Sequence, residues 1–211
     1  MGALNNYITQ VQRLLHDPNS NLCTPQEYVD YINEARCRVA QDSKCLRQQL
    51  VNVTILQNTE SYAVASLDPI IGPLIVDVMN INLYWGQRRY PLFYYSWSEF
   101  NAKLRAYQTF QQRPIAYTRV GGNLVYIAPL PDQNYNSDWD VAINPQPLTS
   151  DGQAETIPPP FTDPVKFWAA YLAKFKEQSF GEAAMFKKEY LANLMMAARS
   201  FQTRILPNVL A

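Results

Sequence analysis

The sequence of 211 residues contains one histidine and three cysteines, too few for most common catalytic designs. His16 would be the base of any Ser-His-Asp or Cys-His scheme, but it ends a helical pattern, where a cation is favoured. Cys23, Cys37 and Cys45 show no CxxC spacing, so neither a zinc site nor a disulfide framework is indicated. We expect reduced thiols, no metal, no cofactor and no enzymatic activity.

Charge and long apolar runs are scarce as well. Eighteen basic residues balance eighteen acidic ones, and 17% of the residues are charged, against roughly 25% in an average protein. This composition does not favour strong binding to nucleic acid. No apolar run approaches the roughly 18 residues of a membrane span, and the first residues do not resemble a signal peptide. We therefore expect a product that is made in the cytosol and does not contact a membrane.

Tyrosine and proline are abundant instead, with fourteen and fifteen residues. Residues 84–97, with the sequence YWGQRRYPLFYYSW, combine seven aromatic side chains with two adjacent arginines. Cross-strand pairs on one sheet face explain some of these aromatics. Tyr94 and Tyr95 are consecutive, however, and point to opposite faces of an extended strand, so both faces need a cover. We expect Phe93 and Trp97 to belong mainly to the core.

The apolar periodicity divides the chain into helical and extended regions. Residues 4–15 and 24–43 have helical spacing, and Thr24 with Glu27 forms a capping box at the second start. From residue 47 apolar and polar residues alternate, which predicts strands. Ser96 and Glu99 predict a short helix within this region. Further strands are expected at residues 61–65, 75–84, 88–93, 115–120, 124–127 and 139–143.

The remaining sequence is first rich in proline and then helical again. Residues 144–160 are expected to form a linker or an extended arm, mobile in the free protomer like the tail at 206–211. Residues 161–211 are expected to form a helical hairpin and a tail. We predict an α+β fold in which residues 1–46 and 161–211 form one helical domain. Residues 47–143 form a β-rich insertion that contains one short helix.

Two acidic residues, Asp138 and Asp140, flank Trp139 and could be read as a pair of catalytic carboxylates. Strand alternation turns both to the same side, away from Trp139. We therefore interpret them as part of a solvated strand face.

An excess of apolar surface outside the expected core suggests contact with neighbouring chains. It occurs in the aromatic stretch, in the C-terminal helices and in the tail. The candidate interface residues are Trp85, Arg88, Arg89, Tyr94, Tyr95, Phe167, Tyr171, Leu191, Leu206 and Leu210.

Four segments resemble proteins encoded among the structural genes of tailed phages. They are YINEARCRVAQDSKCLR, WGQRRYPLFYYSWSEFNA, VYIAPLPDQNY and PFTDPVKFWAAYLAKFKEQSFGEAAMFKKEY. The order of helices, β insertion and helical hairpin is similar to the head-to-tail adaptor proteins of short-tailed phages, over about residues 4–199.

This resemblance implies a structural virion protein at the head-tail junction, assembled in the host cytoplasm. It implies a ring, usually of about twelve copies, that joins the portal protein to the tail nozzle and to fibre or spike proteins. Such a ring forms part of the DNA ejection channel, through which DNA passes without sequence specificity.

Two other functions remain open at this point. Aromatic side chains beside cations hold single-stranded nucleic acids, so residues 84–97 would suit a nucleic-acid-binding accessory protein. A hydrolytic tail component is a more distant possibility, since the chain offers few catalytic groups.

Overall fold

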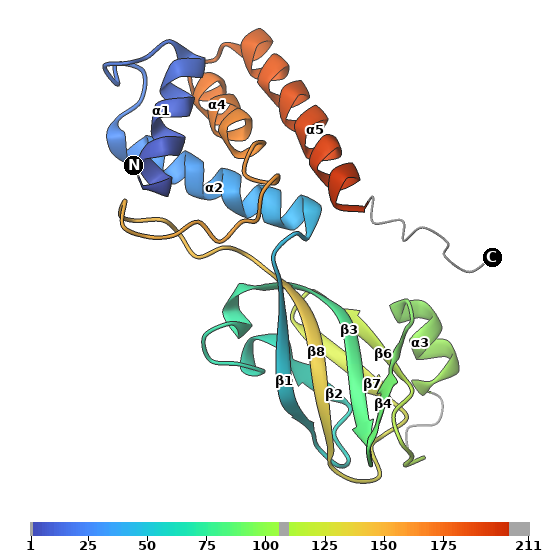
Figure 1. Ribbon diagram of the computed structural model, residues 1–211. Coiled ribbons are helices and arrows are strands. Elements are labelled where there is room, and N and C mark those ends of the chain that lie inside the picture. Colours follow the sequence, from blue (N-terminus) through green and yellow to red (C-terminus); the bar gives the residue numbers. More distant parts are fainter. Residues whose placement is uncertain (1, 106–109, 203–211) are drawn as a thin grey trace, which may run out of the picture. The chain divides into compact units, whose positions relative to one another are not determined.

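The computed structural model describes residues 2–105 and 110–202 (Figure 1). The chain divides into two compact units. One unit is formed by the chain before Arg47 together with the chain after Asn144, and the other is Arg47–Asn144. The long helices lie in the first unit, and the strands with one short helix lie in the second, so the predicted α+β class is confirmed.

The helical unit contains α1 (Ala3–Leu15), α2 (Pro25–Ser43), α4 (Val165–Lys176) and α5 (Phe180–Gln202). The predicted capping box opens α2, where the Thr24 side chain accepts from the Glu27 amide. One core joins all four helices and is built from both ends of the chain. Its buried residues include Leu4, Val11, Leu15, Tyr28, Ile32, Val39, Val165, Ala169, Ala170, Ala173, Tyr190 and Ala197.

Helix α4 faces the core mainly through small residues. Small residues at positions 169, 170 and 173 face the core, while Phe175 is 53% exposed. Alanine side chains allow neighbouring helix backbones to approach closely, and the bulky residues are then left at the edges.

The proline-rich segment before α4 packs onto α2. Leu148 and Ile157 are buried in the helical core. The Asn33 side chain donates to the carbonyl of Leu148 at 2.9 Å and accepts from its amide at 2.8 Å. Arg36 donates to the carbonyl of Gln146 at 2.8 Å. Polar side chains of α2 thus replace the backbone partners that a proline-rich chain lacks, and this segment is part of the helical unit rather than a linker.

Arg36 also forms an ion pair with Glu155 at 2.8 Å. The Arg36 side chain is 1% exposed, and that of Glu155 is 15% exposed. Burial alone would raise the pKa of Glu155, but hydrogen bonds from Arg36 and from the Ile157 amide hold it below its ordinary value. Both members of the pair are therefore charged in the folded protein.

The β unit contains two four-stranded sheets, with strand orders β1-β8-β3-β4 and β2-β7-β6-β5. The strands are β1 (Arg47–Ile55), β2 (Ser61–Ala63), β3 (Ile75–Trp85), β4 (Arg88–Pro91), β5 (Phe93–Tyr94), β6 (Ala116–Val120), β7 (Leu124–Ala128) and β8 (Tyr135–Ile143). The short helix α3 (Trp97–Lys103) follows β5, as predicted. The two sheets share one core that includes Leu50, Ile55, Ile81, Leu83, Tyr117, Val125, Ile127 and Trp139.

Arg36→Ala should lower the free energy of unfolding by about 3 to 5 kcal/mol, because it leaves Glu155 largely buried without its counter-charge. Arg38→Ala is the matched control on the same helix. Arg38 is 48% exposed and pairs with Asp42, so its loss should cost about 1 kcal/mol or less. Urea denaturation followed by circular dichroism measures both variants. Equal effects would show that the buried pair does not hold the proline-rich segment.

Candidate assembly surface

The aromatic stretch at residues 84–97 lies where the chain passes from one sheet to the other. β3 and β4 form the hairpin of the first sheet, closed by the turn at Gly86, whose φ is +61°. β5 then pairs in parallel with β6 of the second sheet. At the crossing, the Leu92 amide donates a hydrogen bond to the carbonyl of Ile81 in β3. The amide of the next residue, Phe93, donates to the carbonyl of Ile115, which precedes β6. One strand was predicted at residues 88–93, and the structure has two.

This crossing decides which aromatic residues are covered. Leu92 is buried, whereas Phe93 and Tyr94 are 65% and 61% exposed. The expectation that Phe93 is a core residue is therefore wrong, because the change of sheet places Leu92 inward in its stead. Tyr95 and Trp97 are half-buried. Trp97 packs on Phe100 and on Tyr126 of β7 with its ring centroid 5.2 Å from the tyrosine ring.

Trp85 lies at the tip of the β3-β4 hairpin and is 50% exposed. Its ring and that of Tyr90 both contact the guanidinium of Arg113, which lies 4.6 Å and 4.5 Å from the two ring centroids. The positive charge of an arginine over an aromatic face is favourable and stiffens the group. Arg113 was not among the candidate residues, because it reaches the hairpin from a distant part of the sequence.

The two neighbouring arginines have different surroundings. Arg89 forms an ion pair with Asp138 and donates to the Tyr84 hydroxyl at 2.9 Å. Arg88 is exposed and has no ion-pair partner among the described residues. Arg89 is thus bonded within the chain although its side chain stays 45% exposed, and the neighbouring Arg88 is exposed as well.

Asp138 is 3% exposed, so the prediction that it lies on a solvated strand face is wrong. β8 is an inner strand of its sheet, and its neighbours β1 and β3, together with the edge strand β4, supply donors to the carboxylate. These are the Tyr84 hydroxyl, Arg89, the Gln49 side chain and the Asn52 amide. Asn52 lies in a β-bulge with φ of +60°. Burial alone would raise the pKa of Asp138, but the hydrogen bonds from Tyr84 and Arg89 lower it.

The candidates of the helical unit are also partly accessible. Phe167 and Tyr171 of α4 are half-buried, and Leu191 of α5 is 43% exposed. Leu206 and Leu210 lie outside the described residues. Further large apolar side chains are exposed on these helices, namely Phe175, Phe180, Met185, Met195 and Met196.

The exposed apolar residues of α5 share one side of the helix. At roughly 100° per residue, positions 185, 195 and 196 fall opposite the buried positions 183, 190 and 197, and positions 180 and 191 fall at the edge of the same side. We call Phe180, Met185, Leu191, Met195 and Met196 the outer α5 face. A helix that is apolar on two sides is typical of an element covered by more than its own chain.

None of the helices in residues 2–105 and 110–202 is long and apolar enough to cross a membrane. In the same ranges, no three His, Cys, Asp or Glu side chains come together as metal ligands would.

Asp138→Ala should lower the free energy of unfolding by about 1 to 3 kcal/mol, because several donors lose one shared acceptor. Asp140→Ala is the matched control two residues away. Asp140 is half-exposed and pairs with Arg47 only at 4.0 Å, so the cost should be about 1 kcal/mol or less. Chemical denaturation of both variants at neutral pH tests this. Equal losses would contradict the role given to Asp138.

The Asp138 carboxylate should also make the folding stability depend on pH. The pKa of Asp138 is lower in the folded than in the unfolded chain. The carboxylate therefore makes its full contribution to the free energy of unfolding above its unfolded pKa of about 4. This contribution is lost as the pH falls through its folded pKa. The difference in stability between wild type and Asp138→Ala should therefore shrink below about pH 4. A difference that stays constant down to about pH 2 would contradict this.

Comparison with known proteins gives a match to a protein family. The family model described as SU10 adaptor protein matches residues 4–208, and so spans both units. No curated protein sequence shows a significant match.

Proposed function

The chain belongs to the SU10 adaptor protein family, and on this premise we propose that it forms a ring joining the portal to the tail of a tailed bacteriophage. The family makes it a phage head-to-tail adaptor and a structural component of the virion. The proposal adds the ring, its partners and the residues that make the contacts.

The observation that carries the proposal is the exposed group of Trp85, Arg88, Phe93 and Tyr94, which we call the hairpin surface. Aromatic and arginine side chains are the most frequent anchors of protein interfaces, because they bury much area and lose little rotamer freedom. In a ring, each protomer has two lateral faces, an upper face and a lower face, so much of its surface is covered by heterologous contacts.

We assign further contacts to Arg89, Tyr95, Phe167, Tyr171, the outer α5 face and the tail residues Leu206 and Leu210. The partners in this proposal are neighbouring copies, about twelve in a ring, the portal protein above, and the tail nozzle with fibre or spike proteins below. The equal numbers of acidic and basic residues suit a channel through which DNA moves, since a strongly basic wall would retain the phosphates.

The three cysteines support assembly in the reducing host cytoplasm. Burial raises the pKa of the Cys23, Cys37 and Cys45 thiols. They are therefore protonated and unreactive at neutral pH.

Arg88→Ala and Tyr94→Ala should each weaken association by about 1 to 4 kcal/mol and leave the thermal midpoint of the free protein nearly unchanged. Phe100→Ala is the control for a core residue. Phe100 is fully buried, so its truncation should cost about 3 to 5 kcal/mol of folding stability. For each variant, the thermal midpoint of the free protein and its incorporation into portal-containing particles are both measured. If both surface variants lose folding stability in proportion to incorporation, the hairpin surface is a core element and not a contact.

DNA binding separates this proposal from the nucleic-acid-binding alternative. A ring subunit of balanced charge should show only weak binding to single-stranded DNA at physiological salt. Tight binding that falls steeply with salt and is lost in Arg88→Ala would instead favour the accessory protein.

A further inference from the structure

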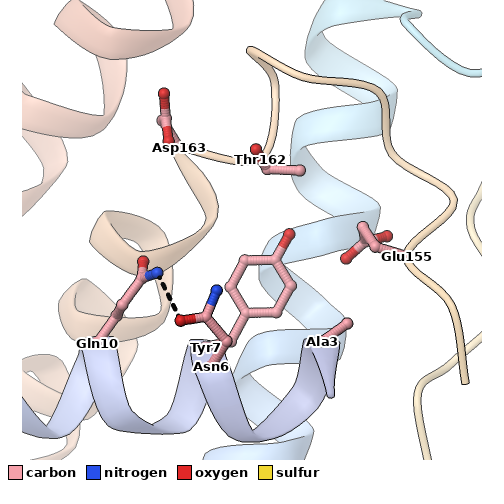
Figure 2. Close-up of a pocket in the computed structure, with 7 residues that line it drawn as sticks. All are labelled: Ala3, Asn6, Tyr7, Gln10, Glu155, Thr162 and Asp163. Carbon is pink, nitrogen blue, oxygen red and sulfur yellow. Dashed lines mark hydrogen bonds between the residues drawn. The ribbon is translucent and has the colours of Figure 1, made fainter. Parts of the chain in front are cut away.

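The hollows of the helical unit differ in their lining. One lies between α1 and the proline-rich segment, and most of its lining side chains are polar, among them Asn6, Gln10 and Thr162 (Figure 2). Another, of about 330 Å³, lies among the end of α1, the end of α4 and the first turns of α5. We call it the α1-α5 hollow. Its apolar lining consists of Leu14, Leu15, Met185 and Phe186.

The α1-α5 hollow is open to solvent, because Met185 at its edge is 70% exposed. Its volume is at the lower end of the roughly 300 to 1,000 Å³ of protein binding pockets, so it has room for one large side chain. Methionine is unbranched and polarizable, and its sulfur makes favourable contacts with aromatic rings. The lining is therefore suited to an aromatic side chain from outside the unit.

The rim of the α1-α5 hollow is acidic. Glu182 and Glu189 lie two turns apart on α5, with the apolar lining of this helix between them. Lys174 of α4 pairs with Glu182 at 3.0 Å, but it is shared with Glu177 at 2.8 Å. Glu189 is exposed and has no ion-pair partner in the part of the chain that the structure describes. With His16 counted as neutral, the lining carries two negative charges and one positive charge, which favours a cation beside the apolar group.

The tip of the β3-β4 hairpin presents such a combination. Trp85 and Arg88 are opposite each other in the strand register, and residues in this relation point to the same face with Cβ atoms roughly 5 Å apart. Only Gly86 and Gln87 lie between them in the chain, so both side chains stand at the end of the hairpin. Trp85 is 50% exposed and Arg88 is exposed as well. Arg113 adds a second cation, 4.6 Å from the centre of the Trp85 ring.

We propose that the hairpin tip of one copy docks into the α1-α5 hollow of the next copy in the ring. The Trp85 ring enters the hollow against Met185 and Phe186, and Arg88 forms an ion pair with Glu189. This contact joins two different surfaces of the same chain, so it is heterologous and repeats from copy to copy until a ring closes. The inference rests on the ring of the proposed function and adds the residues by which successive copies join.

Cysteine cross-linking in portal-containing particles tests this contact. Particles are assembled from equal amounts of Gln87→Cys, at the hairpin turn, and Glu182→Cys, at the rim of the hollow, and are treated with a short bismaleimide cross-linker. A dimer between the two variants should form. Particles of either variant alone, and wild-type particles with the three native cysteines, should not give it.

A second mixture is the matched control for position. It combines Gln87→Cys with Gly152→Cys, an exposed site where an added Cβ would meet no atom within 4 Å. The neighbouring Asp151 accepts from the amides of Gly2 and Asn5 at the first turn of α1. The α1-α5 hollow lies at the other end of this helix. The control mixture should therefore give no dimer.

Charge reversal tests the ion pair. Arg88→Glu and Glu189→Arg should each reduce incorporation into particles about tenfold or more, because each brings like charges together at the contact. The double variant, in which the two charges are exchanged, should recover most of the wild-type incorporation. Glu34→Arg, which reverses an exposed charge on α2, should leave incorporation unchanged and should not rescue Arg88→Glu. The thermal midpoints of the free variants should equal that of the wild type, since these side chains are exposed.

The inference is overturned if the Gln87→Cys and Glu182→Cys mixture gives no more dimer than the control mixture. It is also overturned if Glu189→Arg loses incorporation and Arg88→Glu does not restore it, because the hollow would then hold another partner. Should a charge variant fail to fold, the cross-link decides in its place. Microscopy of the same particles separates the two proposals. A closed ring without the cross-link overturns this contact alone, whereas a cross-linked dimer without a ring keeps the contact and overturns the ring.

Discussion

The buried ion pair between Arg36 and Glu155 joins parts of the helical unit that are 119 residues apart in the chain. The unit is interrupted by the whole β unit, and this contact ties the returning chain to α2. Arg36 and Asn33 of α2 form hydrogen bonds with side-chain and backbone groups of the proline-rich segment, which itself has few backbone donors. Because a charged pair is costly to bury unless both members are fully bonded, this contact favours one arrangement of the segment over others.

The β unit has its own core and is thereby free to carry a contact surface. Its sheets are connected at Leu92, where the chain leaves one sheet and joins the other. Leu92 at this crossing is buried in the core, and Phe93 and Tyr94 beyond it are exposed. The ion pair with the buried Asp138 ties Arg89 of the hairpin to the inner strand β8, so the exposed side chains of β4 stand on a strand bonded to its sheet.

Local features of the sequence predicted the helices, the capping box at Thr24 and most strands, because these depend on residues a few positions apart. The errors have a common origin in distant contacts. Asp138 is buried by donors from β1 and β3, and Arg113 reaches the hairpin from beyond α3. Strand alternation also fails at Leu92, because a change of sheet shifts the inward position by one residue.

Electron cryo-microscopy of assembled particles tests the central claim, that the chain is a ring adaptor with the hairpin surface at a contact between chains. We expect a closed ring of this protein between portal and tail, with Trp85, Arg88 and Tyr94 covered by a neighbouring chain. A map in which the protein lies elsewhere in the virion, or in which these three side chains face solvent, would contradict it.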